Sequence, residues 1–351
     1  IADLVAVGLV RETAPVGRGV GRPSYGVEPV HERAYVLAID LRVDRAIVAL
    51  VGFGGEVLGR REHRFRKGQQ REERILAQLA DVCRELLAEA PKRAVQVGVG
   101  IGVPGLVRQP DGLVRFAPNL GWVDVPLAEH LRDELKVSTP VVVGNDSDLG
   151  AVAERLRGSA MGAANVVYLS GQVGVGGGIV IDGTLLKGAQ GYGGEVGHMR
   201  VNPQGRECRC GAIGCWETEI GLPAVARALH LPEDAASDDL IAALARVEPD
   251  DGTLTEVGRY LGLGMASIIN LVNPRLFIVG GLLREVFPLV QQQVEETLRA
   301  AALTAPADQA RVAVPALGGD SALFGASELA WSDLLADPTA VLGGRDLQVM
   351  P

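Results

Sequence analysis

The sequence has few cysteines, no long apolar run and no excess of positive charge. Only 4 of its 351 residues are cysteine, which fits a reducing compartment better than an oxidising one. No apolar run reaches the roughly 18–20 residues of a membrane span, and no signal peptide is recognisable. We therefore expect a cytoplasmic protein that has no membrane partner.

The charge balance is acidic, with a formal net charge of -9. A chain of this charge does not present a nucleic-acid-binding surface as a whole, so any contact with DNA must be local. The hydrophobic content is 47% over 351 residues. A chain of this size can bury a sizeable core, and we expect that core to be divided between two lobes.

Three of the four cysteines lie in one short stretch. Cys208, Cys210 and Cys215 fall within eight residues, and His198 lies ten residues before the first of them. Cys208 and Cys210 are too close in sequence to form an easy disulfide with each other. Three thiolates and one imidazole are typical of the closed tetrahedral shell of structural zinc, so we predict a zinc site here. A disulfide or reduced surface thiols would be the alternative.

Two carboxylates, Glu195 and Glu217, lie just outside these four residues. Carboxylates accept hydrogen bonds from hydroxyl groups, and His198 could bind zinc through one ring nitrogen and donate a hydrogen bond from the other. The combination predicts one wall of a small-molecule site that suits a polyol. The alternative is a pair of solvated acids beside a structural metal clip.

The stretch G-G-E-V-G-H at residues 193–198, followed by C-R-C-G-A-I-G-C-W-E at 208–217, resembles the signature of the ROK family, which groups sugar kinases with sugar-responsive repressors. The resemblance implies an α/β chain with the two-lobed actin/hexokinase-like (ribonuclease H-like) fold. The loops at 102–105 and 117–122 resemble the sugar-binding loops of the family, which implies that Asn119 contacts the ligand. Its amide offers both a donor and an acceptor to a pair of hydroxyl groups.

The order of the expected elements is similar to that fold. Three strands in succession, then a helix and a further strand, resemble one lobe, and a second copy of the pattern begins near residue 165. The fourth cysteine, Cys83, falls within the helical pattern, and we expect it to pack in the core. The expected elements are strands at 35–40, 46–51, 56–58 and 95–101, a helix over about 70–90, and second-copy strands at 165–169, 178–181 and 276–281.

We predict three segments in the chain. Residues after about Asp337 show little periodicity, and we expect them to form a loosely held tail. The predicted segments are the end of a winged-helix DNA-binding domain at 1–28, a first lobe at 29–150 completed by a C-terminal helix over about 321–336, and a second lobe at 151–320 that carries the zinc loop at 198–215.

The N-terminal residues favour the end of a DNA-binding head. Residues 1–10 read as the end of an amphipathic helix stopped by Gly8, and residues 10–27 as two extended runs joined by a basic, glycine-rich hairpin. Arg18 and Arg22 at its tip could reach phosphates or a minor groove. The stretch G-R-P-S that contains Arg22 resembles the wing before the sugar-binding region of ROK repressors. A flexible basic leader is the alternative.

An apolar strand over 141–145 is followed by Asp146. A carboxylate at the end of a buried strand lies at the mouth of a cleft, where ligands gather. The resemblance implies that the matching residue of the kinases is the general base that takes the proton from the sugar hydroxyl. Asp146 could do this or only accept a hydrogen bond, and it could also be the N-cap of a helix that starts near Leu149.

Two loops that would cradle nucleotide phosphates decide between a kinase and a sensor. The resemblance implies Asp-x-Gly-x-Thr after the first strand, but residues 40–44 read D-L-R-V-D. The first acid is kept, while an arginine, a valine and a second acid fill the turn with bulk and an added negative charge. In the second loop, over 171–178, the glycines mostly remain, but Val173 stands where a hydroxyl residue is implied.

We therefore favour a regulator from the repressor branch of the family, similar to xylose or N-acetylglucosamine repressors, over an enzyme. It would bind a sugar or sugar phosphate between its lobes and operator DNA through its head. It would form a homodimer or homotetramer, because paired half-sites need paired heads. The predicted ligands of the effector are Asn119, Asp146, Glu195, His198 and Glu217, and those of zinc are His198, Cys208, Cys210 and Cys215.

Two alternatives remain open at this point. The chain could be an active, glucokinase-like sugar kinase with divergent phosphate loops, in which Asp146 is the general base and ATP with Mg²⁺ is the phosphoryl donor. It could also be a sugar-binding scaffold whose DNA-binding part is vestigial.

Overall fold

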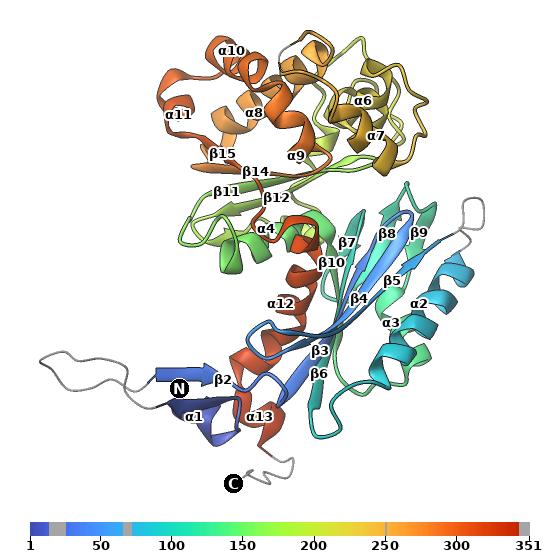
Figure 1. Ribbon diagram of the computed structural model, residues 1–351, viewed down its shortest axis with the longest axis vertical. Helices are drawn as coiled ribbons and strands as arrows, with labels where there is room; N and C mark the ends of the chain where they lie inside the picture. Colours follow the sequence, from blue (N-terminus) through green and yellow to red (C-terminus); the bar gives the residue numbers. More distant parts are fainter. Residues whose placement is uncertain (14–25, 66–71, 250, 344–351) are drawn as a thin grey trace, which may run out of the picture.

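The computed structural model describes residues 1–13, 26–65, 72–249 and 251–343. Figure 1 shows two lobes stacked one above the other, with helix α12 running down from between them to the end that carries the N-terminus. Each lobe is built on a five-stranded sheet, with strand order β10-β6-β3-β4-β5 in the first and β13-β12-β11-β14-β15 in the second. The repeated strand pattern of the sequence therefore corresponds to two similar sheets.

The first sheet begins as an antiparallel meander of β3 (Ala34–Leu41), β4 (Arg45–Gly52) and β5 (Val57–Arg64). Strands β6 (Val95–Val103) and β10 (Val141–Asn145) extend it in parallel to β3. Every residue of β3 is buried. A strand at the centre of a sheet that is covered on both faces reads as a continuous apolar run, which is why the sequence predicted it well.

Helices cover both faces of this sheet. Helices α2 (Glu72–Leu87) and α3 (Leu127–Leu135) pack on one face, and Cys83 is fully buried in that core as expected. Helix α12 (Ser321–Ala336) packs on the other face, against β6 and β3. A Cβ atom at Gly100 would lie 1.9 Å from the carbonyl oxygen of Ala326, so the glycines of β6 let the backbone of α12 approach the sheet.

A small antiparallel sheet beside the first lobe holds one wall of the cleft. It consists of β7 (Leu106–Arg108), β8 (Leu113–Ala117) and β9 (Trp122–Val125). Trp122 is almost fully buried, and the turn between β8 and β9 carries Asn119. The predicted sugar-binding loop is therefore a tight hairpin turn anchored by a large buried side chain.

The second sheet has an antiparallel part and a parallel part. Strand β11 (Val166–Gly171) pairs antiparallel with β12 (Val175–Ile181) and parallel with β14 (Leu276–Gly281), and the edges are β13 (Thr184–Leu185) and β15 (Arg311–Ala313). The strands that the sequence predicted for a second copy are present. They bring the glycine-rich 171–175 turn to the side that faces the first lobe (Figure 1).

Helix α8 (Thr255–Val272) packs against α10 (Gln291–Ala301) above this sheet, and α4 (Asp146–Arg157) lies between the two lobes (Figure 1). The remaining described helices of this lobe and of the approach to α12 are short. They are η1 (Ala189–Gly191), η2 (Val196–His198), α5 (Trp216–Ile220), α6 (Leu222–Ala228), α7 (Ser237–Leu244), α9 (Leu283–Val286), η3 (Phe287–Leu289), α11 (Thr304–Gln309) and η4 (Gly318–Asp320).

Helices α4 and α12 are fastened to each other. The buried carboxylate of Glu154 in α4 accepts hydrogen bonds from the backbone N–H groups of Ala316 and Leu317, both at 3.0 Å, and from the hydroxyl of Ser321 at 2.8 Å. A buried carboxylate with this many donors is well satisfied. Glu154 therefore ties the start of α12 to α4, the helix that lies between the two lobes.

The N-terminal residues form a short helix and a hairpin. Helix α1 (Ala2–Ala6) is followed by Gly8, whose φ of +72° is the left-handed conformation that ends many helices. Strands β1 (Val10–Thr13) and β2 (Gly26–Pro29) then pair antiparallel, as the extended runs predicted. Arg18 and Arg22, the predicted DNA contacts, lie outside the described residues.

Residues 338–343 differ from the expected loose tail, and the rest of that predicted tail lies outside the described residues. Residues 338–342 form helix α13 (Pro338–Leu342), and the side chain of Asp337 caps it by accepting from the N–H of Ala340 at 2.9 Å. Leu342 is fully buried in one cluster with Leu9 and Leu334. The helix was missed because five residues are too few to show a period. No helix in the described part of the chain has the length and apolar character to cross a bilayer.

Candidate functional site

A cleft of about 80 Å³ opens between the two lobes. Its walls come from the β8–β9 turn, the start of α4, the β11–β12 turn and the segment around η2 and α5. All five residues that were predicted to bind a sugar line this one cleft: Asn119, Asp146, Glu195, His198 and Glu217. Residues far apart in the sequence thus converge on a space where a small polar molecule could be held.

The junction of β10 and α4 aims Asp146 into the cleft. Asn145, not Asp146, is the N-cap of α4: its side-chain oxygen accepts from the N–H of Ser147 at 2.8 Å and of Asp148 at 3.1 Å. The prediction of a helix that starts near Leu149 with Asp146 as its cap was therefore wrong. Because Asn145 supplies the cap, the carboxylate of Asp146 remains available to a ligand.

The charge of Asp146 is tuned by its surroundings. Burial, and next the negative charge of Asp40, raise the pKa of Asp146 to about 6, while hydrogen bonds from Ser147 oppose this shift. At neutral pH the carboxylate is still mostly ionised, and it can accept a hydrogen bond from a hydroxyl group. A carboxyl group with this pKa in a cleft could also act as a general base.

The four predicted metal donors come together. The ligand atoms of His198, Cys208, Cys210 and Cys215 all lie within 4.8 Å of one another. The Cys208 thiol is 3.7 Å from Nδ1 of His198, and the Cys210 and Cys215 sulfurs are also 3.7 Å apart. Ligands of a tetrahedral zinc ion lie roughly 3.3–3.8 Å apart, whereas a disulfide needs about 2.05 Å. The cluster could hold a metal ion.

Tight turns shape the loop that carries this cluster. Gly211 and Gly214 have φ values of +88° and +79°, which favour glycine. Space also excludes a side chain at Gly214, where a Cβ atom would lie 1.6 Å from the carbonyl oxygen of Asn202. The spacing of the cysteines in the sequence is therefore set by two obligatory turns between them.

Glu217 joins the cluster to the cleft. Its Oε1 accepts a hydrogen bond from the Cys208 thiol at 2.8 Å, and its Oε2 accepts one from the N–H of Val175 at 3.3 Å. His198 belongs to both, because it lines the cleft and its Nδ1 lies 3.7 Å from the Cys208 sulfur within the cluster. The side chains of one wall are thus held by the same loop that carries the thiols.

Sequence reasoning missed Arg209, which lies between two of the cysteines. Its guanidinium donates a hydrogen bond to the side-chain oxygen of Asn119, so a residue of the thiol loop reaches a first-lobe residue across the cleft. The position of Arg209 inside the C-R-C stretch was the available signal. Its partner could not be inferred without the fold.

The turn after β3 is closed by a salt bridge. Asp40, which is almost fully buried, accepts from Nε of Arg42 at 2.8 Å and from Nη2 at 2.6 Å. The same Nη2 donates to the carbonyl oxygen of Gly319 at 2.5 Å. The sequence predicted bulk and added negative charge here. The structure corrects this, because Asp44 turns outward to Arg45 while Arg42 brings a positive charge inward.

The glycines of the second loop have a packing role. A Cβ atom at Gly176 would lie 2.1 Å from Oγ of Ser147, and one at Gly178 would lie 2.5 Å from its carbonyl oxygen. The first turn of α4 therefore needs these glycines in β12 in order to approach the sheet. Their presence is explained without a bound phosphate.

Asp148 is a second residue that sequence reasoning missed. It is 9% exposed, and within the described chain its Oδ1 has no hydrogen-bond partner. Burial, and next the charge of Glu195, raise the pKa of Asp148 to about 8. The group is therefore held protonated at neutral pH behind the wall that carries Glu195.

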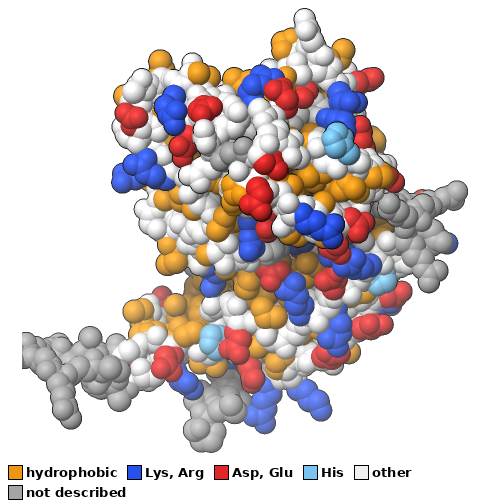
Figure 2. All heavy atoms as spheres, turned by 45° about the horizontal axis from the view of Figure 1, so that its top comes forward, with side chains coloured by type: hydrophobic (Ala, Val, Ile, Leu, Met, Phe, Trp, Pro, Cys, Tyr) orange, Lys and Arg blue, Asp and Glu red, His pale blue; other side chains and the backbone are white. Residues whose placement is uncertain are grey.

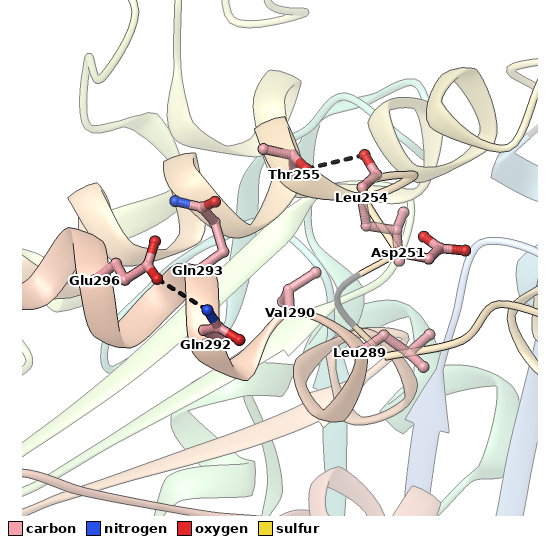
Figure 3. A pocket seen from close by; sticks show the side chains of 9 residues that line it. Asp251, Leu254, Thr255, Leu289, Val290, Gln292, Gln293 and Glu296 are labelled. Atoms are coloured by element: carbon pink, nitrogen blue, oxygen red, sulfur yellow. Dashed lines mark hydrogen bonds between the residues drawn. The ribbon is translucent and has the colours of Figure 1, made fainter.

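Another hollow, of about 130 Å³, lies in the second lobe and contains none of the predicted site residues. Figure 3 shows that its polar side chains are partly bonded to their neighbours, with Thr255 donating to the backbone at Gly252 and Gln292 to Glu296. On the face shown in Figure 2, acidic and basic side chains are interspersed over both lobes. The interlobe cleft is therefore the candidate functional site, because the predicted site residues come together there.

Comparisons with known proteins agree with this geometry. The model of the ROK family matches residues 36–332. The xylose repressor of Caldicellulosiruptor bescii is 30% identical over 352 residues, covering 94% of this chain and 88% of that protein.

Two solved structures show the same architecture. A ROK family transcriptional regulator, described as a homolog of the Escherichia coli MLC protein, has a TM-score of 0.80 and 28% identity over 97% of this chain and 89% of that one. A ROK family glucokinase from Streptomyces griseus, in complex with glucose and AMPPNP, has a TM-score of 0.72 and 28% identity over 85% of this chain and 100% of that one. The chain belongs to the ROK family and has its two-lobed actin/hexokinase-like fold.

Proposed function

We propose that the chain is a sugar-responsive transcriptional repressor that binds its effector in the interlobe cleft. The five cleft residues Asn119, Asp146, Glu195, His198 and Glu217 would hold the hydroxyl groups. The observation that carries this proposal is the salt bridge between Arg42 and Asp40, which fills the turn where a kinase of the family would receive phosphates. A relative named a xylose repressor matches 94% of this chain, which also supports a regulator.

The metal would be a structural zinc ion held by His198, Cys208, Cys210 and Cys215. The donor set and its separations of 3.7 Å support this choice. Its role would be to fix the loop that carries Glu217 and to orient His198, since outer partners of a metal site are positioned by the metal.

The DNA-binding part would be a winged helix at the N-terminus, of which residues 1–28 include the wing, with Arg18 and Arg22 as phosphate or groove contacts. At the C-terminal end of α12, Leu334 belongs to the same buried cluster as Leu9. At the N-terminal end, α12 begins directly after Asp320, which forms an ion pair with Arg60 at 2.7 Å. This continuous helix supports a path from the cleft to the head. Paired heads in a homodimer or homotetramer would then change their spacing when an effector biases lobe closure.

Calorimetric titration with a panel of sugars, each with and without ATP and Mg²⁺, tests the proposal. Xylose, glucose and N-acetylglucosamine form the initial panel, and ADP formation is followed in parallel. We expect one sugar to bind without ADP formation. The full-length protein should also bind a selected DNA fragment and slow its migration in a gel. Addition of the sugar should change the fraction of DNA that is bound. Absence of both sugar binding and DNA retardation would refute a sugar-responsive repressor.

A second candidate is an ATP-dependent sugar kinase with Asp146 as general base. The pKa of about 6 at Asp146 favours it, because a base of this strength is ionised at neutral pH and can still take a proton. Changing Arg42 to Gly and Asp44 to Thr would restore the phosphate loop implied by the family. If the chain is a kinase, these changes should raise an ADP-forming rate that the unmodified protein already has.

A further inference from the structure

We infer that the effector of the cleft is a neutral, unphosphorylated sugar, and that the pairing of Arg42 with Asp40 makes the site reject phosphate esters. The inference rests on the proposed function and narrows it, because a sugar-binding cleft could equally have served a sugar phosphate.

The lining of the cleft is acidic. The charged side chains among the described residues that line it are the carboxylates of Asp146, Glu195 and Glu217, accompanied by His198. No lysine or arginine belongs to this described lining. Carboxylates suit the hydroxyl groups of a neutral sugar because they accept hydrogen bonds, but they repel a phosphate dianion in a partly desolvated site.

Arg42 directly precedes Val43, which lines the cleft. Its charge interacts with that of Asp146. Arg42 is therefore the side chain with which a phosphate group on a bound sugar could form an ion pair. That charge is already matched by Asp40, which accepts from two of its nitrogens. Phosphate recognition by arginine needs a guanidinium that is free to turn its paired donors to the ligand.

Two nearby arginines make hydrogen bonds to other side chains. Arg60 makes two hydrogen bonds to Asp320, at 2.7 and 2.9 Å, and Arg209 donates to Asn119. Lys187 is exposed and does not belong to the lining, and its charge lowers the pKa of Asp148. The described residues that line the cleft thus offer acceptors for hydroxyl groups, and none of them is a lysine or an arginine that could bind a phosphate group.

Titration of matched pairs tests the inference on the unmodified protein. The pairs are D-glucose with D-glucose 6-phosphate, N-acetylglucosamine with its 6-phosphate, and D-xylose with D-xylose 1-phosphate, which keeps the pyranose ring. For the sugar that binds, we expect its ester to bind at least about a hundredfold more weakly, given the repulsion between like charges a few ångströms apart. An ester that binds as tightly as its sugar, or more tightly, overturns the inference and leaves the sugar site in place. If no member of any pair binds, the proposed function fails as well.

The substitution Asp40→Asn tests the role of the pairing. It keeps the shape of the side chain and releases the charge of Arg42, so affinity for the ester should rise at least about tenfold, as expected for a new charge-assisted contact, while affinity for the free sugar changes little. Asp44→Asn removes the same charge from the same turn at an outward-facing, exposed position, and it should change neither affinity. A folded Asp40→Asn protein with unchanged ester affinity would show that another feature selects the ligand.

Discussion

The thiol of Cys208 donates a hydrogen bond to Oε1 of Glu217 at 2.8 Å. A member of the predicted metal cluster is therefore bonded directly to a residue that lines the cleft. A cysteine that binds zinc is a thiolate and has no proton to donate, so metal binding would replace this hydrogen bond. The metal would still set the positions of Cys208 and Glu217, because both belong to the loop that it holds. The structural site and the sugar wall should accordingly be coupled.

Replacement of Cys210 by Ser should weaken sugar binding even though Cys210 does not line the cleft. The loss of one thiolate should release the zinc ion and loosen the loop that carries Glu217, and such changes typically cost about tenfold to a hundredfold. Calorimetry together with measurement of the zinc content checks this. Cys83→Ala is the matched control, because this thiol is buried in α2 and should affect neither zinc nor sugar. An unchanged sugar affinity in zinc-free Cys210→Ser protein would show that the two features are independent.

Sugar affinity should fall as the pH drops through the pKa of about 6 at Asp146. The ionised carboxylate is the better acceptor for a sugar hydroxyl, and below its pKa the binding constant should fall by up to about tenfold per pH unit. Titrations between pH 5 and 8 measure this. Asp146→Asn should bind about tenfold to a hundredfold more weakly at pH 8, as expected for the loss of a charged hydrogen bond.

The Asn variant separates the effect of the Asp146 charge from the effect of pH on the rest of the protein. The affinities of the unmodified protein and of Asp146→Asn should converge near pH 5, where both side chains are neutral. Parallel profiles across the whole range would mean that the charge of Asp146 does not contribute to binding.

Asp148→Asn should stabilise the protein at neutral and alkaline pH. The pKa of Asp148 is raised from 3.8 in a model peptide to about 8, so the folded protein holds its proton more tightly than the unfolded chain. The contribution of this group to stability is complete below about pH 4 and is lost as the pH rises to about 8, by up to about 1.4 kcal/mol per pH unit.

Thermal unfolding from pH 4 to 9 measures the effect. The variant should melt at a higher temperature than the unmodified protein at pH 8 and show a smaller decline between pH 4 and 8. Asp133→Asn, on the exposed side of α3, should leave the pH profile unchanged. Identical profiles for Asp148→Asn and the unmodified protein would mean that Asp148 is ionised in the fold.

Features that repeat along the chain could be predicted from the sequence. The apolar runs of β3 and β4 identify strands buried on both faces, and the spacing of the cysteines indicates a common ligand set before any fold is known. The residues that were predicted to bind a sugar lie within or next to recognisable motifs, and the fold brings them to one cleft. In these cases the physical cause acts over a few neighbouring residues.

Features that depend on distant partners could not be predicted in the same way. Arg42 looked like an obstruction in a loop, and only the fold brings the Gly319 carbonyl to it. Asp148 looked like an ordinary residue in the first turn of a helix, and its burial results from the packing of α4 against β12 and the segment around Gly194. A single sequence does not reveal contacts that arise from chain segments hundreds of residues apart.

The packing of α13 leads to a prediction for the N-terminal segment. Leu342 is fully buried in one cluster with Val7 and Leu9, so Leu342→Ala should cost about 2–4 kcal/mol through the lost contact and the cavity it leaves. Amide hydrogen exchange of residues 4–10 should rise at the same time, while sugar affinity should stay unchanged because α13 follows the C-terminal end of α12, away from the start of α12. Leu335→Ala removes the same atoms from a side chain that is 51% exposed, and it should cost no more than about 0.5 kcal/mol. Equal effects of the two substitutions on the free energy of unfolding would mean that α13 does not hold the N-terminal segment.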